Sequence, residues 1–247
     1  MLAKRVLVAA ILLPIGLVLI YLGGWPFSLF IALMLGLAAF EYGRLFRSGG
    51  YHPEDRLMIG LAVALPLARN WQGFTLDGLL IGLFLLLSLT YHLWRYERGR
   101  DQAATDFTVT VGGGLYIGFT GAYLISLRNL PEGMWWVLLA LPAVWLADSG
   151  AYFVGRAYGQ HKLNKRLSPK KSWEGYFGGI VLGTAGTALL ALAWQALALR
   201  WHVALGSATS ITPFNGAVLG LVASLLTILG DLGESMIKRQ FGAKDSG

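Results

Sequence analysis

The stretch PFNGAVLGLVASLLTILGDLGESMIKRQFGAKDSG (residues 213–247) is an apolar run long enough to span a membrane, followed directly by six charged side chains. If this stretch is helical, one face carries four polar residues at positions i, i+3, i+4 and i+7, namely Asp231, Glu234, Ser235 and Lys238. Because a carboxylate at the centre of a bilayer costs about 2.5–3.5 kcal/mol, the two acids need cations to balance them. Either neighbouring basic residues neutralise them within a self-paired helix end, or the face holds a divalent cation together with a phosphate.

The composition is that of an integral membrane protein. Hydrophobic residues make up 55% of the chain and charged residues only 13%, with a mean hydropathy of +0.59; a soluble domain carries roughly 25% charged residues. The chain has no cysteine, which excludes disulfides and thiolate sites. We expect one membrane domain over residues 1–247, with less distinctive helices to about residue 130 and the candidate site within about 134–247.

The apolar residues fall into eight blocks, which predicts an all-α polytopic fold of about eight transmembrane helices. A straight span needs about 20 apolar residues, so some of these helices would be tilted or broken. The third block is the weakest, because it is short and contains a proline. The first block follows two basic residues, as in a secretory signal, but no convincing cleavage site follows, so we expect a retained helix. The blocks lie at approximately 6–22, 27–46, 56–70, 74–94, 106–127, 134–155, 173–199 and 213–237.

The basic residues are distributed unevenly between the connectors. If the N-terminus is cytoplasmic, 17 of the 20 lysines and arginines fall on the cytoplasmic side, and only Arg69, Arg128 and Arg200 fall on the other. The segments 156–172 and 238–247 then face the same compartment. The net charge of +7 does not indicate nucleic-acid binding, because no solvated basic stripe with stacking aromatic residues is present.

A second candidate site lies at Asp148, which follows an apolar stretch and should therefore face the interior of a helix bundle or a wet cavity. Arg156 is a potential structural partner, but it lies about two helical turns away, which is a long reach for simple pairing.

A third candidate lies in the basic connector that contains Ser168, Pro169, Lys170 and Lys171. Ser168 is expected to be an N-cap with Pro169 at the first helical position. The two lysines would then lie in the first turn, where cations oppose the helix dipole unless an anion is bound. The alternative is an ordinary basic loop that touches anionic lipid headgroups.

Other motifs give weaker evidence for a functional site. Glu41 lies near a membrane boundary with Arg44 at i+3, and we interpret this as ion pairing rather than a site. The four histidines are scattered without the spacing of metal ligands, and no Walker A lysine or nucleophile elbow is present. Zinc hydrolysis and triad acyl transfer therefore have no support.

At the acidic and basic segments the chain resembles the bacterial phosphatidate cytidylyltransferase family. The family's C-terminal signature begins Ser-x-x-Lys-Arg, continues with four residues and then Lys-Asp-x-Gly, which matches Ser235 to Gly247. Segments similar to the family's also occur, in the expected order, at 40–43, 147–152, 159–162, 168–175 and 230–234. The signature should continue with a Pro-x-His-Gly-Gly segment and a last hydrophobic helix, so we expect this sequence to stop within it.

The resemblance implies transfer of a cytidylyl group from CTP to phosphatidic acid, giving CDP-diacylglycerol and pyrophosphate, in the bacterial inner membrane. It implies Mg²⁺, with room for a second cation, held by Asp231 as the principal ligand and by Asp148 and Asp245. It assigns a catalytic role to these three residues and to Lys238. The residues implied to bind substrate are Ser168, Lys170, Lys171, Glu234, Ser235, Arg239 and Lys244.

Two other functions remain open from the residues alone. An ion-coupled transporter or cation channel would use Asp148, Asp231 and Glu234 to bind its ion, but it does not explain why lysines and arginines gather on one side of the membrane. A noncatalytic lipid-binding scaffold would explain the basic connectors but not the acids beside apolar helices. The expected partners are CTP, phosphatidic acid and membrane lipids, and small-residue motifs in several helices would suit a homodimer.

Overall fold

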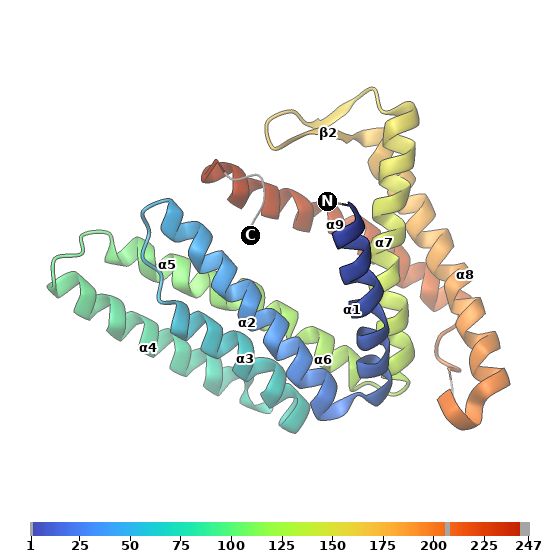
Figure 1. Ribbon diagram of the computed structural model, residues 1–247, viewed down its shortest axis with the longest axis horizontal. Coiled ribbons are helices and arrows are strands. Elements are labelled where there is room, and N and C mark those ends of the chain that lie inside the picture. Colours follow the sequence, from blue (N-terminus) through green and yellow to red (C-terminus); the bar gives the residue numbers. More distant parts are fainter. Residues whose placement is uncertain (1, 206–207, 243–247) are drawn as a thin grey trace. The chain divides into compact units, whose positions relative to one another are not determined.

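The computed structural model describes residues 2–205 and 208–242, which form two compact units divided between Leu130 and Pro131. The first unit contains the helices α1 (Leu2–Leu22), α2 (Gly24–Ser48), α3 (Asp55–Gln72), the 3-10 turn η1 (Gly73–Leu76), α4 (Asp77–Glu97), α5 (Ala103–Gly113), the π-helical segment η2 (Gly114–Phe119) and α6 (Tyr123–Arg128). The second contains α7 (Gly133–Tyr158), the strands β1 (Lys162–Asn164) and β2 (Ser168–Ser172), α8 (Trp173–Leu205) and α9 (Pro213–Gln240) (Figure 1). The expectation of a single membrane domain stays a prediction.

The helical membrane architecture agrees with the sequence analysis, but the count of eight spans is not confirmed. Each of the eight apolar blocks lies in helical structure, and the fifth block is broken into α5, η2 and α6. Among the described residues, six helical segments are long and apolar enough to cross a membrane. The number is lower because α3 to α4 forms one continuous segment of 43 residues, and because the side chains described in α1 comprise a shorter apolar helix, Leu12–Leu22.

In the first unit, α3 packs against α2, α4 and η2 (Figure 1). Leu61, Leu65 and Phe84 form part of its buried core. A Cβ atom on Gly118 would lie 2.9 Å from the Cα atom of Ala62, so the π-helical segment approaches α3 backbone to backbone. This unit also holds Glu41, which is exposed on α2.

A buried ion pair joins the end of α3 to the start of α4. The Nη2 and Nε atoms of Arg69 donate hydrogen bonds to Asp77 Oδ2 over 2.8 and 3.0 Å, and Nη1 donates to Ser126 Oγ over 3.3 Å. The guanidinium also lies 4.1 Å from the ring centroid of Tyr123. Because the Arg69 side chain is fully buried, this pair is closed to solvent.

In the second unit, α7, α8 and α9 contact one another through glycines (Figure 1). A Cβ atom on Gly179 of α8 would lie 2.7 Å from the carbonyl oxygen of Ala147 on α7. Likewise, a Cβ atom on Gly216 of α9 would lie 2.8 Å from the carbonyl oxygen of Thr187 on α8. Only glycine permits such close backbone contact, which explains the small residues in these helices.

The connector between α7 and α8 is a short antiparallel hairpin formed by β1 and β2. The side chain of Asn164 organises its turn, because Oδ1 accepts hydrogen bonds from the backbone N–H groups of Arg166 and Leu167 over 3.1 and 2.9 Å. The prediction that Ser168 is an N-cap with Pro169 at the first helical position is therefore wrong, since both residues lie in β2.

The N-terminus of α8 lies four residues later, at Ser172. The Ser172 hydroxyl accepts a hydrogen bond from the backbone N–H of Gly175 over 3.2 Å, as an N-cap does. Glu174 then lies in the first turn, where a carboxylate complements the helix dipole. Lys170 and Lys171 stay in the strand, outside the helix, so the conflict with the dipole expected from the sequence does not arise.

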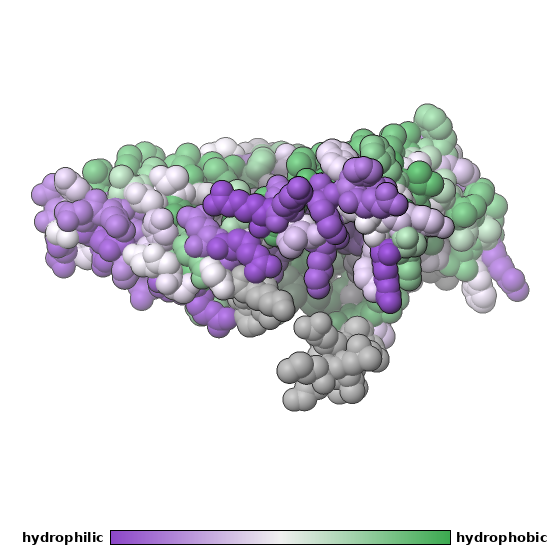
Figure 2. All heavy atoms as spheres, turned by 90° about the horizontal axis from the view of Figure 1, so that it is seen from above, coloured by the Kyte–Doolittle hydropathy of each residue, from purple (hydrophilic) through white to green (hydrophobic). Residues whose placement is uncertain are grey.

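Hydrophilic residues gather at the hairpin end of the second unit, and hydrophobic residues lie to its sides, as Figure 2 shows. The hairpin itself contributes Lys162, Lys165, Arg166, Lys170 and Lys171. This segregation agrees with apolar helices that end in a basic, water-facing connector.

Substitution of Gly179 by alanine tests the glycine contact between α7 and α8. The new Cβ would collide with a backbone carbonyl that cannot move alone, so we expect destabilisation of about 1–3 kcal/mol and a lower melting temperature in detergent. The matched control is Gly82→Ala in α4, where the added Cβ would meet no atom of the described residues within 4 Å. Equal melting temperatures for the two variants would contradict this packing.

Candidate active site

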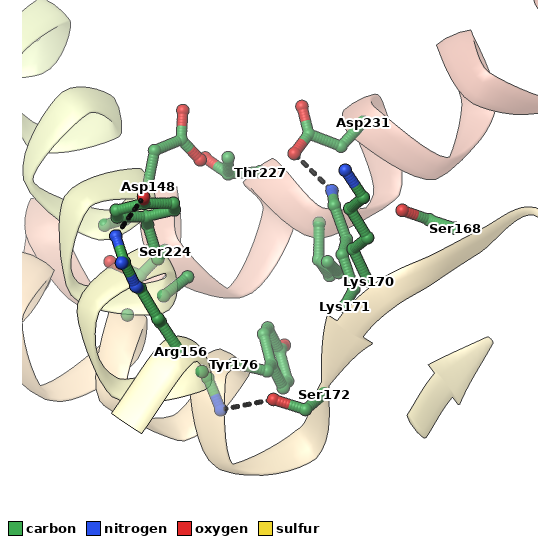
Figure 3. Close-up of a pocket in the computed structure, with 17 residues that line it drawn as sticks. Asp148, Arg156, Ser168, Lys170, Lys171, Ser172, Tyr176, Ser224, Thr227 and Asp231 are labelled. Carbon is green, nitrogen blue, oxygen red and sulfur yellow. Dashed lines mark hydrogen bonds and ion pairs between the residues drawn. The ribbon is translucent and has the colours of Figure 1, made fainter. Parts of the chain in front are cut away.

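A cavity of about 510 Å³ opens in the second unit, between the hairpin and the ends of the helices nearest to it (Figure 3). Its walls come from α7, β2, α8 and α9, through residues between 147 and 179 and between 224 and 231. The lining includes charged and hydroxyl-bearing side chains as well as small apolar residues. The polar lining residues are Asp148, Tyr152, Arg156, Ser168, Lys170, Lys171, Ser172, Tyr176, Ser224, Thr227 and Asp231.

The two acids singled out in the sequence meet in this cavity. Asp148 comes from α7 and Asp231 from α9, and Figure 3 shows their carboxylates on the same side of the cavity, with Thr227 between them. The expectation that Asp148 faces a cavity is confirmed.

One lysine of the hairpin neutralises the acid of α9. The Nζ atom of Lys171 donates a hydrogen bond to Asp231 Oδ2 and forms an ion pair with it (Figure 3). The side chains are 28% and 42% exposed, so the pair remains accessible to water and to ligands. Lys170 also lines the cavity, and within residues 2–205 and 208–242 the structure gives it no ion pair.

Arg156 lines the cavity but does not act as the partner of Asp148 that the sequence analysis considered. Its Nη1 atom instead donates a hydrogen bond to the hydroxyl of Tyr152 over 3.1 Å. Tyr152 was missed by the sequence analysis, although helical spacing could have found it. It lies four residues after Asp148 and four before Arg156, so all three share one face of α7.

The remaining residues of the C-terminal face do not line the cavity. Lys238 forms an ion pair with Glu234 over 2.5 Å, one turn apart on α9, which is the self-paired arrangement left open by the sequence. Ser235 and Arg239 also lie on α9 beyond Asp231. The structure thus brings Asp231 to the cavity and leaves its helical neighbours outside.

Two of the predicted site residues, Lys244 and Asp245, lie outside the described residues. Their assigned roles stay predictions.

Glu174 closes the base of the hairpin, a role that the sequence analysis missed. Its carboxylate accepts hydrogen bonds from the backbone N–H groups of Gln160 and His161 over 3.1–3.2 Å, and it contacts His161 Nδ1 at 2.5 Å. The carbonyl of His161 in turn accepts a hydrogen bond from the N–H of Trp173 over 2.9 Å. These contacts set the position from which β2 reaches the cavity.

The donor atoms of the cavity suit a hard divalent cation. Mg²⁺ is usually held by one or two carboxylates together with water and substrate phosphates, so Asp148 and Asp231 are a suitable protein contribution. Within the described part of the chain no group of three His, Cys, Asp or Glu side chains could hold a metal ion.

Comparison with known proteins identifies the family. The sequence pattern of the Cytidylyltransferase family matches residues 3–247. The chain belongs to this family. Among curated relatives it is 35% identical to a phosphatidate cytidylyltransferase of Pseudomonas aeruginosa, with 100% of this chain and 87% of the relative covered. It is 30% identical to the enzyme of that name in Synechocystis sp. (99% and 86% covered) and 31% identical to the one in Bacillus subtilis (99% and 87% covered).

Membership in the cytidylyltransferase family confirms the resemblance found in the sequence and makes the chain a nucleotidyltransferase. No observation favours the transporter or channel alternative.

Replacement of Glu174 by alanine tests whether this side chain holds the hairpin. Without the carboxylate, Gln160 and His161 lose their acceptor, and the basic hairpin should open more often. The rate of proteolysis is proportional to the fraction of molecules in which the hairpin is open. We therefore expect trypsin to cleave between residues 162 and 171 about fivefold faster. Glu97→Ala, an exposed acid at the end of α4, is the control and should leave the rate unchanged. An unchanged rate in Glu174→Ala would contradict this role.

Proposed function

We propose that this cytidylyltransferase-family protein transfers the cytidylyl group of CTP to phosphatidic acid, forming CDP-diacylglycerol and releasing pyrophosphate. One observation carries the proposal. Asp148 and Asp231, from separate apolar helices, line one cavity together with the cationic side chains Arg156, Lys170 and Lys171. The names of the curated relatives supply the substrate class.

The reaction forms one bond to phosphorus and breaks another. A phosphate oxygen of phosphatidic acid attacks the α-phosphorus of CTP, and the bond from that phosphorus to the bridging oxygen of the β-phosphate breaks. Pyrophosphate leaves with the electron pair. Because the substrate supplies the nucleophile, no side chain has to form a covalent intermediate.

The two substrates are both anions, so catalysis depends on holding them together and neutralising their charge. Lys170 and Arg156 are positioned to contact phosphate oxygens, because both line the cavity without an ion pair in the described part of the chain. Ser168 offers a hydroxyl on the same strand.

Asp231, and less centrally Asp148, would hold Mg²⁺. When bound, this ion neutralises the phosphate groups that approach the two carboxylates. Asp245, Lys244, Lys238, Arg239, Glu234 and Ser235 remain candidates for further ligand or phosphate contacts, and the fit of a second cation is untested.

The expected topology follows from charge. The hairpin and the end of α9 carry basic residues, which supports a multi-pass protein of the bacterial inner membrane with its N-terminus and cavity towards the cytoplasm. CTP would then enter from the cytoplasm, and the apolar lining of the cavity would accommodate the lipid. The small-residue motifs in several helices would suit a homodimer.

The variant Asp231→Asn tests the proposed reaction. The amide keeps the side-chain volume but removes the charge, so we expect kcat for CDP-diacylglycerol formation to fall at least about a hundredfold, with expression and melting temperature retained. The assay supplies the purified full chain in detergent with phosphatidic acid, CTP and Mg²⁺, and it scores pyrophosphate together with the lipid product.

The control for this variant is Asp101→Asn, an exposed acid in the connector between α4 and α5, which should retain activity. Full activity of Asp231→Asn would overturn the ligand assignment. Absence of CTP-dependent product from the unmodified chain would overturn the proposed function itself.

Removal of divalent cations tests the metal requirement separately. We expect EDTA to abolish product formation and added Mg²⁺ to restore it. Ca²⁺ should restore much less, because it is larger and prefers more ligands at longer distances. Undiminished activity in EDTA would exclude a divalent cation from the reaction.

A further inference from the structure

Adjacent lysines on β2 have different surroundings in the cavity. Lys171 forms an ion pair with Asp231 on α9. Lys170 lines the same cavity, but no ion pair to it is found in the described part of the chain. Figure 3 shows Lys171 joined to Asp231 by a dashed line, with Lys170 beside it.

The contact between Lys171 and Asp231 involves the same carboxylate that would hold a divalent cation. Two cations cannot share one carboxylate oxygen at short range without strong repulsion. Lys171 therefore competes with a divalent cation for Asp231, and it must leave Oδ2 if the cation is to bind that oxygen. The pair can separate readily, since both side chains are partly exposed to the cavity and to water.

We infer that Lys171 is an internal counter-ion that exchanges partners when substrate binds. It neutralises Asp231 in the empty cavity, it yields this carboxylate to a divalent cation, and it then contacts the incoming phosphate. This inference rests on the proposed function for the identity of the ligands, and it assigns Lys171 and Lys170 different roles. Lys170 is available to phosphate at all times, whereas Lys171 becomes available only when Asp231 has another cation.

The exchange couples cation binding to phosphate binding. The first ligand to bind, whether cation or phosphate, has to break the contact between Lys171 and Asp231. The second ligand then finds this contact already broken. Such coupling is reciprocal, so each ligand raises the affinity of the other by the same factor. The cavity would thereby disfavour a lone cation or a lone nucleotide.

The first test measures Mn²⁺ binding without nucleotide, by electron paramagnetic resonance of the free ion, for the purified full chain and two single variants. Lys171→Met frees Asp231, so we expect about fivefold tighter Mn²⁺ binding. Lys170→Met removes the same charge from the next residue and should change the affinity less than twofold. Lys171→Gln serves as a second variant, and melting temperatures verify that each variant is folded.

The second test is the reverse measurement, CTP binding in EDTA by isothermal titration calorimetry. Asp231→Asn releases Lys171, so we expect it to bind metal-free CTP several-fold more tightly than the unmodified chain, even though the same variant loses activity. The gain should disappear in the double variant Asp231→Asn/Lys171→Met, whereas a gain caused only by the lost repulsion between Asp231 and CTP would persist there.

Two results would overturn the inference. One is Mn²⁺ affinity in both Lys171 variants that is equal to or weaker than in the unmodified chain. The other is equal tightening in Lys170→Met, which would show a general effect of net charge. Both are distinct from failure of the proposed function, which appears only as absence of CTP-dependent lipid product.

Discussion

Charge balance inside an apolar helical unit is the constraint on which the site depends. α7 and α9 each carry an acid after a long apolar run, and in the described part of the chain neither helix provides an ion-pair partner for Asp148 or Asp231. The cation comes from β2, in a hairpin of the intervening connector. The hairpin must therefore be held in place, and Ser172 and Glu174 do this at the start of α8. The glycine contacts among the three helices bring the two acids to one cavity.

Two of the ion pairs, Arg69–Asp77 and Lys171–Asp231, illustrate different uses of the same chemistry. Arg69 is fully buried, bonded to Asp77 and Ser126 and surrounded by aromatic rings, so its partners cannot be exchanged without leaving a buried charge unpaired. Lys171 and Asp231 are partly exposed and line a cavity. The first pair joins two helices permanently, whereas the second is open to competition from ligands.

Several features of the site were predictable because they depend on local patterns. A carboxylate beside a long apolar run has to find a cavity or a cation, which singled out Asp148 and Asp231 separately, and in the structure both line one cavity. The face of four polar residues predicted around Asp231 was less informative, because helical spacing shows which residues share a face but not which of them another element approaches. Lys238 pairs with Glu234 outside the cavity for this reason.

The mistaken N-cap at Ser168 has a similar cause. Ser172 offers the same local signal four residues later, and the pairing of β1 with β2 decides between the two serines.

The sequence by itself determined the membrane character, the helical class, the clustering of basic residues in particular connectors and the family resemblance. Composition, the lengths of hydrophobic blocks and signature motifs can all be read from the order of residues along the chain. Only the tertiary structure decided which charges meet. It paired Lys171 rather than Lys170 with Asp231, and it placed the Glu174 carboxylate against Gln160 and His161 at the base of the hairpin. These outcomes depend on contacts between residues up to 60 positions apart, and electrostatic attraction depends on distance in space rather than along the sequence.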